Sequence, residues 1–305
     1  EVKDSNRRSR LIPFAFNTDQ TYVLEFGHNT LRVIMDGGYV EASPGAVYEI
    51  ASPYPEADLP TLAYVQSADV MTLVHGLHPP RELRRTGHAA WAFSDIAFTP
   101  SITPPASVSA TPFTSYTELP TETYRYKITA VADGTMEESV ASAEASVTNY
   151  SLGRYTHQPS DGPVEYRDNY NTVSWSVVPG AKRYHVYKMG NGLFGFVGTS
   201  EGTSFKDNNI EPDETDTPPE ARNPFDGSGN YPSTATFYEQ RRVFANSVAN
   251  PQTIWMTASG SYRNMNVSTP TKDDDAVTVT IASRQVNAIR HLVPLTSLIA
   301  LTAGG

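Results

Sequence analysis

Residues 22–26 read YVLEF, residues 27–30 GHNT, residues 31–35 LRVIM and residues 36–40 DGGYV. The first and third segments are rich in aromatic and β-branched residues, and the other two carry Gly, Asn and Asp. Apolar runs of this length, joined by turn-forming residues, are typical of an antiparallel β-meander. Residues 11–40 therefore predict a chain built from β-strands.

The composition extends this prediction to the whole chain. Its 305 residues suggest about two domains. The counts of 23 Pro and 17 Tyr favour β-structure with many turns. Charged residues make up 18% and hydrophobic residues 39%, which excludes a charged disordered chain and a membrane protein. The fold class expected is all-β.

Charge and cysteine content exclude several functions. The net charge of −10 disfavours tight binding to nucleic acid or to anionic membranes, although it allows DNA to slide past. The absence of cysteine excludes disulfides, zinc–thiolate sites and a cysteine nucleophile. The uncharged stretch 292–305 contains Pro294 and predicts one or two buried strands instead of a membrane span. The start at Glu1 and the end at Gly305 predict a fragment of a longer protein.

A faint internal repeat suggests how the chain is organised. Residues 72–87 align without gaps with residues 243–258, and both read as a strand, a loop reaching a proline (Pro80 or Pro251) and a second strand. The identity is low, so chance similarity is the competing explanation. Four-stranded units of this kind repeat radially in β-propellers.

Three regions follow from this repeat. Residues 1–100 are interpreted as the first blade-like part of a β-platform, and residues 221–305 as its continuation. Residues 101–220 form an inserted domain. Within the insertion, residues 138–147 are compatible with a short helix, but alternation before the Asp133-Gly134 turn favours a hairpin.

The insertion resembles a fibronectin type III sandwich. A strand Trp, a Pro-Gly-Ala turn and a Tyr-x-Val-Tyr strand occur in that order over residues 175–188, and residues 203–207 resemble the strand that follows. Residues 124–130, followed by Glu138-Ser139, resemble the last hairpin of that fold, although they come earlier in this chain. The resemblance implies a permuted immunoglobulin-like sandwich, with two incomplete modules as the alternative.

The flanks resemble a family of bacteriophage tail proteins, the tail nozzle or tail tubular protein B of short-tailed phages. Seven runs carry this resemblance, and they cover most of the chain outside the insertion. They are residues 9–16 (SRLIPFAF), 22–27 (YVLEFG), 55–59 (PEADL), 66–71 (QSADVM), 78–83 (HPPREL), 237–242 (FYEQRR) and 274–276 (DDA).

The resemblance implies a partial β-propeller-like platform in a virion structural protein. It implies a homohexamer ring around a channel through which DNA is ejected without specific binding. It also implies contacts with a tail adaptor protein and with tail fibre or spike proteins, and no membrane-spanning segment. Members of the family are usually longer than this chain.

Candidate chemistry is weak by comparison. His75 and His78 have a metal-like i, i+3 spacing, but Pro79-Pro80 excludes a helix after them, so they are expected to be loop histidines, as is His88. Asp273–Asp275 and the loop Asp207–Asp216 lack the spacing of a calcium loop and are expected to be solvated turns.

Enzyme signatures are also missing. Ser228, between Gly227 and Gly229, lacks the strand–turn–helix setting of a hydrolase nucleophile, and no phosphate-binding loop is present. No pair of carboxylates lies in a glycosidase motif. The chain is therefore expected not to be an enzyme, and no residue is assigned to catalysis, to a cofactor or to a metal.

The basic and aromatic residues have ordinary explanations. The clusters Arg7–Arg10 and Arg81–Arg85 are expected to be solvated strand edges, with phosphate or an acidic partner as the alternative ligand of the first. Trp91, Trp175 and Trp255 lie in alternating strands and are expected in the core, with stacking on a sugar as the alternative.

The sequence thus favours a structural component of a phage tail. The alternative is a non-enzymatic adhesion module that binds a receptor or a glycan, although such a module would not need the repeat on both sides of the insertion. A polysaccharide-cleaving tail enzyme is a third, weaker reading.

Overall fold

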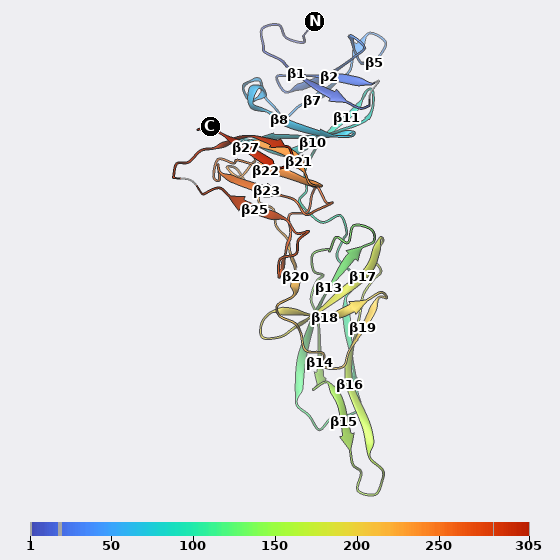
Figure 1. The fold of residues 1–305 in the computed structure, drawn as a ribbon. Coiled ribbons are helices and arrows are strands. Elements are labelled where there is room, and N and C mark those ends of the chain that lie inside the picture. Colours follow the sequence, from blue (N-terminus) through green and yellow to red (C-terminus); the bar gives the residue numbers. More distant parts are fainter. Residues whose placement is uncertain (1, 18–19, 283, 305) are drawn as a thin grey trace. The chain divides into compact units, whose positions relative to one another are not determined.

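The computed structural model describes residues 2–17, 20–282 and 284–304, and it confirms the all-β class (Figure 1). The sheets are open, and η1 (Glu56–Thr61) is a 3-10 helix. In the part of the chain that the structure describes, no helix has the length and apolar character needed to cross a membrane.

The chain divides into two compact units. The first unit comprises Glu1–Ala97, Asn223–Met256 and Val277–Gly305, and the second comprises Phe98–Arg222 and Thr257–Ala276. This division differs from the regions expected from the sequence in one part. The segment 257–276 was expected to continue the platform, but it belongs to the second unit, because Asn266 and Lys272 bond to groups of that unit.

The stretch that predicted the fold forms the first sheet. Its strands run antiparallel in the order β1-β2-β3-β4, with β7 paired to β3. Asp36 (φ 53°) and Gly37 (φ 79°) both have left-handed backbones, as the tight turn between β3 and β4 requires. The bounds are β1 (Arg10–Ala15), β2 (Thr21–Gly27), β3 (Thr30–Met35), β4 (Gly38–Tyr39) and β7 (Glu49–Ala51), and β5 (Glu41–Ser43) pairs with β6 (Ala46–Val47).

Two further sheets of the first unit have the same topology. Each is a four-stranded antiparallel meander, in the orders β8-β9-β10-β11 and β21-β22-β23-β25. The segments aligned as a repeat, 72–87 and 243–258, supply the two middle strands of each meander. The bounds are β8 (Ala63–Ser67), β9 (Val70–His75), β10 (His78–Gly87), β11 (Ala90–Asp95), β21 (Thr234–Tyr238), β22 (Arg241–Ala245), β23 (Thr253–Met256) and β25 (Val277–Thr280).

Alternating side chains from these sheets form the cores of the first unit. One cluster joins the first two sheets and includes Tyr54 together with Phe14, Tyr22 and Trp91, and the last three rings meet edge to face. A second cluster gathers around Val243 and includes residues of the hairpin β26 (Ile289–Pro294) and β27 (Leu298–Thr302). The predicted strands at 292–305 are thus present, but they are only partly buried, since Ile299 and Leu301 are exposed.

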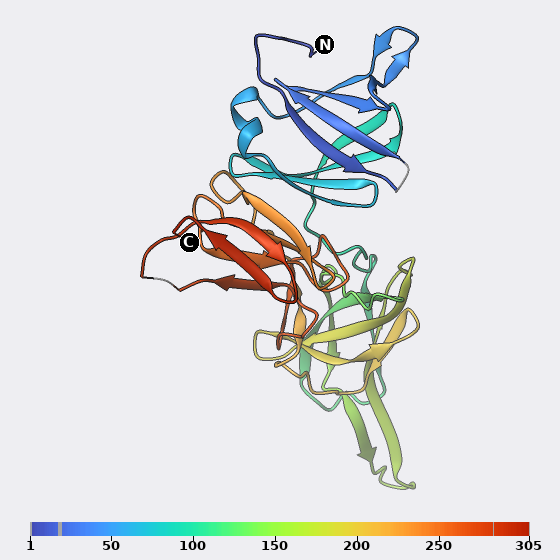
Figure 2. The ribbon, with the colours of Figure 1, turned by 45° about the horizontal axis from the view of Figure 1, so that its top comes forward.

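The second unit contains two four-stranded sheets. One has the order β14-β13-β17-β18, and in the other β16 pairs with β12, β15 and β19. The bounds are β12 (Ser109–Thr114), β13 (Thr121–Ala132), β14 (Ala145–Tyr150), β15 (Gly153–His157), β16 (Glu165–Ser174), β17 (Ala181–Met189), β18 (Phe194–Ser200), β19 (Ser204–Asp207), β20 (Thr217–Glu220) and β24 (Val267–Thr269). Figures 1 and 2 show the β15–β16 hairpin extending beyond the other strands of the unit.

Residues of both sheets form the core of the second unit. Trp175, which follows β16, packs edge-on against Tyr184 of β17, with ring centroids 5.3 Å apart. Ile128 and Ala130 of β13 and Val197 of β18 join the same cluster. The hairpin expected before residue 150 is confirmed, since β13 pairs with β14 in register.

Gly195 of β18 lies against the backbone of the Asp213 segment. A Cβ at residue 195 would lie 2.6 Å from the carbonyl carbon of Asp213 and 2.8 Å from the nitrogen of Glu214. Phe196 and Asp213 exchange backbone hydrogen bonds of 2.9 and 3.1 Å, so these atoms cannot rotate away.

We expect Gly195→Ala to lower the free energy of unfolding of the second unit by about 1–3 kcal/mol. Gly202→Ala is the matched control, because the nearest heavy atom to its added Cβ is 3.9 Å away. Hydrogen exchange of the β18 amides measures both variants, and equal effects would contradict the steric argument.

Candidate functional site

Six of the seven runs on which the resemblance rests lie in the first unit, where they contact one another. The runs 9–16 and 22–27 pair as β1 and β2. The side-chain amide of Gln66 bonds both backbone groups of Ala15, at 3.1 and 2.6 Å. The guanidinium of Arg10 donates to the carbonyl oxygen of Leu59 at 2.6 Å. These bonds join the runs 66–71 and 55–59 to the first strand.

Two charged contacts complete what we term the run network. Asp58 of the run 55–59 bonds His78 of the run 78–83, with Oδ2 and Nε2 2.7 Å apart. Arg242 of the run 237–242 donates to Glu82 of the run 78–83 at 2.8 Å. The seventh run, 274–276, lies in the second unit and outside the network.

The ion pair between Arg242 and Glu82 is buried, with 4% and 3% of the two side chains exposed. Removing two charges from water costs several kcal/mol per ion, and their attraction repays this only when both are present. Each side chain therefore depends on the other, and β22 and β10 are held in one arrangement.

A histidine cluster, defined as Asp58, His75 and His78, lies within the run network. His75 is the last residue of β9, His78 is the first of β10, and they are register partners across a two-residue turn. Partners in such a pair project from the same face of the sheet. Asp58 approaches from η1, and one ligand atom from each residue lies within 4.8 Å of the other two. The expectation of loop histidines is wrong, because both residues are strand ends.

His75 is held by two neutral hydrogen bonds. Its Nδ1 accepts the backbone N–H of Leu77 at 3.2 Å, and its Nε2 lies 2.8 Å from the hydroxyl of Thr61. Burial lowers the pKa of His75, and the charge of Asp58 opposes this in part. The ring is therefore neutral at pH 7 and can offer a lone pair.

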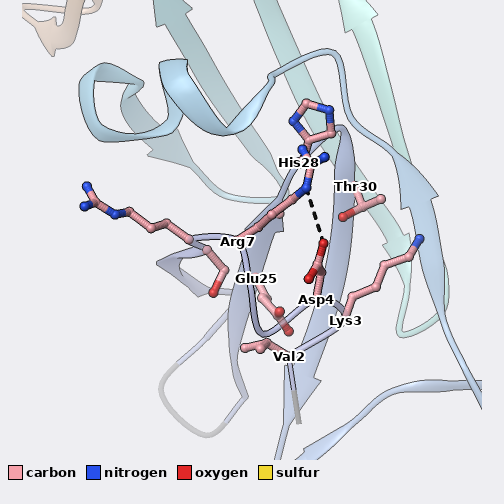
Figure 3. Close-up of a pocket in the computed structure, with 10 residues that line it drawn as sticks. Val2, Lys3, Asp4, Arg7, Glu25, His28 and Thr30 are labelled. Atoms are coloured by element: carbon pink, nitrogen blue, oxygen red, sulfur yellow. Dashed lines mark ion pairs between the residues drawn. The ribbon is translucent and has the colours of Figure 1, made fainter.

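A pocket of about 410 Å³ adjoins the N-terminal segment and β2 (Figure 3). Lys3, Asp4, Arg7, Glu25 and His28 line it, so both signs of charge face it. Arg7 pairs with Asp4 at 3.3 Å inside the pocket. Arg8 also lines the pocket, so three cationic side chains face two carboxylates there.

The second basic cluster is also paired with acids. Arg81 bonds Asp95 at 2.7 Å, and Arg85 bonds Asp69 at 3.2 Å. The guanidinium of Arg85 also lies over the Phe16 ring, 4.2 Å from its centroid. The prediction of a solvated edge is therefore wrong for Arg81 and Arg85, because Asp95 of β11 and Asp69 of the β8–β9 turn are their partners.

Glu138 is the most strongly perturbed acid of the second unit. Burial would raise its pKa, but hydrogen bonds from His185, Thr129 and Tyr187 lower it to about 2. Its Oε1 lies 2.5 Å from the hydroxyl of Thr129 and 2.7 Å from that of Tyr187. Its Oε2 lies 3.4 Å from Nζ of Lys272. Both carboxylate oxygens of Glu138 therefore have bonding partners within the second unit.

Two acids expected in solvated turns have structural roles. Asp207 is fully buried, where it bonds Lys188 at 3.2 Å and the hydroxyl of Tyr126 at 2.7 Å. This corrects the prediction for Asp207, since it ends β19 and is the register partner of Asn171 on β16. Asp275 accepts backbone N–H bonds from Ser268 and Lys272, which fixes a turn.

The three tryptophans, Ser228 and His88 are the remaining residues that the sequence analysis named. Trp91, Trp175 and Trp255 are about 5% exposed or less, which confirms the prediction of core packing. Ser228 is exposed in a turn, and the exposed His88 bonds the hydroxyl of Tyr22 through Nδ1 at 2.9 Å.

No protein-family model matches the chain, and no curated protein matches it significantly.

We expect Glu82→Ala to lower the free energy of unfolding of the first unit by about 3–5 kcal/mol, because it leaves a buried charge without its partner. Replacing both residues by methionine should cost much less. Asp95→Ala is the matched control, because Asp95 is 67% exposed in its pair with Arg81 and should cost at most about 1 kcal/mol. Hydrogen exchange of the β10 amides measures all three variants. A double variant as unstable as Glu82→Ala would contradict the explanation.

The stability of the second unit should depend on pH through Glu138. Its folded pKa, about 2, lies below the ordinary 4.5, so its ionised form stabilises the fold above about pH 4.5. This contribution, about 3 kcal/mol, is lost as the pH falls to about 2.

Glu138→Gln should therefore be less stable than the wild type at pH 7, and the two should converge near pH 2. Glu144→Gln is the control, since that carboxylate is 36% exposed. Hydrogen exchange of the β13 amides across this pH range measures the difference, and a gap that does not change with pH would contradict the assignment.

Proposed function

We propose that this chain is a structural protein of a bacteriophage tail, a component of the tail nozzle that forms a ring around the DNA exit channel. The run network carries the proposal. Six sequence runs that resemble the nozzle family, spread from residue 9 to residue 242, meet in one unit through the bonds of Arg10, Gln66, Asp58 and Arg242. Runs shared with a family are expected to meet in this way if they encode a common platform.

The sheets of the first unit support the platform part of the proposal. Two four-stranded meanders come from segments on either side of an inserted unit, and β21 lies beside β8 and β9. Four-stranded antiparallel sheets are the blades of β-propellers. We assign the first unit to a partial propeller-like platform.

The strand order of the second unit supports a permuted fibronectin type III sandwich. The hairpin β13–β14 comes before β16, β17 and β18 in the chain, yet β13 pairs with β17. In the resemblance noted above, this hairpin would be the last of the fold. A permuted order requires that the β13–β14 hairpin come early in the chain and still pair with a strand that follows it, and β13 pairs with β17.

The assembly and partners follow from the same resemblance. The ring would be a homohexamer in the virion that contacts a tail adaptor protein and tail fibre or spike proteins. The net charge of −10 suits a wall that DNA passes without specific binding, because few cations would hold its phosphates.

A second candidate function is an adhesion module that binds a glycan. It is favoured by exposed aromatic side chains on neighbouring strands of the second unit, Phe113 at 46% and Tyr166 at 64% exposure. Such rings can stack on a sugar. The Phe113 ring, however, already stacks on Tyr170, with centroids 4.5 Å apart, and the Arg154 guanidinium lies 4.4 Å from the centroid of the Tyr166 ring.

We expect the purified protein to form six-fold rings with a central hole of DNA width, alone or with a tail adaptor protein. Mass photometry gives the assembly mass, and negative-stain imaging gives the symmetry. A monomer that persists with the adaptor present would contradict the nozzle proposal. Binding on a glycan array that is lost in Tyr166→Ala would then support adhesion.

A further inference from the structure

We propose that the histidine cluster of Asp58, His75 and His78 binds a zinc ion, a role that goes beyond the proposed architecture and does not depend on it. Two imidazoles and a carboxylate form a donor set that suits zinc. One ligand atom from each residue lies within 4.8 Å of the other two. Calcium and magnesium prefer oxygen ligands, so the two imidazoles disfavour them.

The backbone already places two of the ligands. His75 and His78 flank a two-residue turn as register partners, and their ring centroids are 5.3 Å apart. The His78 ring also packs edge-on against the buried Tyr54, with centroids 5.2 Å apart. These contacts restrict the two rings before a metal binds, which reduces the ordering that binding must supply.

Small movements convert the cluster into a zinc site. Zinc binds nitrogen and oxygen at about 2.0–2.2 Å, which places neighbouring ligand atoms about 3.4 Å apart in a tetrahedron. Oδ2 of Asp58 and Nε2 of His78 lie 2.7 Å apart, so they separate by about 0.7 Å. Atoms at the 4.8 Å limit approach by about 1.4 Å. Rotation of the partly exposed Asp58 and His78 side chains supplies this movement.

The protonation of the two histidine rings also allows a metal to bind. The proton between His78 Nε2 and Asp58 moves to Nδ1 of the same ring, which leaves Nε2 free to bind the ion. A metal on His75 replaces one of its two hydrogen bonds, to Thr61 or from the Leu77 amide. Three protein ligands leave the fourth position to water, as in zinc sites that are not closed.

The site would fasten η1 to the β9–β10 hairpin. Asp58 belongs to the first element and the histidines to the second, and the hydrogen bond of Asp58 to His78 already joins them. Zinc binding to the folded state alone stabilises that state by mass action. The fold therefore contains a place where zinc raises stability without any change of topology.

Isothermal titration of the full chain without a polyhistidine tag, with zinc chloride as the probe, tests this proposal. We expect one zinc per chain with micromolar or tighter affinity. His78→Ala should weaken binding by at least about 100-fold. His88→Ala is the matched control, because His88 is an exposed histidine of the same unit that bonds Tyr22 instead of Asp58.

A second measurement needs no variant. Cobalt in place of zinc should give the visible bands of a tetrahedral site with nitrogen and oxygen ligands. Absence of zinc binding, binding that survives His78→Ala, or an equal loss in His78→Ala and His88→Ala would each overturn the proposal. Because ring formation is measured separately, a monomeric protein that binds zinc would overturn the nozzle proposal alone.

Discussion

A buried ion pair between Arg242 and Glu82 joins two stretches of the first unit that lie 160 residues apart in the chain. Such a pair contributes little net stability, because desolvation consumes most of the Coulombic attraction. Its consequence is specificity. Any packing that separates β22 from β10 breaks this buried charged bond, and breaking such a pair costs far more than the pair contributes. The two meanders are therefore held to one arrangement, although Phe98–Arg222 of the second unit separates them in the chain.

The other polar contacts of the first unit extend this constraint outward from Glu82. His78, four residues before Glu82 on β10, bonds Asp58 of η1. Arg10 of β1 donates to the carbonyl oxygen of Leu59, the residue that follows Asp58. The apolar core cannot supply this selectivity, because hydrophobic burial has no direction. The directional polar bonds therefore determine which elements of the first unit lie side by side, and the hydrophobic core stabilises that arrangement.

Local features of the sequence predicted the elements, and contacts between distant residues decided what the sequence could not predict. Alternation and the Asp36-Gly37 turn identified the first sheet, and the apolar setting of Trp175 identified a core residue. The burial of Asp207 was not predictable, because its partners Lys188 and Tyr126 lie on other strands. The pairing of His75 with His78 had a signal, since a two-residue turn makes i and i+3 partners, but the spacing was weighed only against a helix and the two residues were expected in a loop. The place of residues 257–276 had no local signal.

The two perturbed clusters differ in whether their donor atoms are free to change partners. Both oxygens of Glu138 are bonded, by Thr129, Tyr187 and Lys272. Against the effect of burial, its pKa is lowered by His185 first and then by the bonds from Thr129 and Tyr187. A general acid or base needs a proton or a lone pair that faces a substrate. This arrangement therefore favours a structural role for Glu138. In the histidine cluster, His75 is held by two neutral bonds, one of them a 3.2 Å contact from a backbone amide, and His78 bonds the Asp58 carboxylate, which is itself a metal ligand in the proposed site. A metal ion can outcompete such bonds, so chemistry beyond architecture is best sought at the turn between β9 and β10.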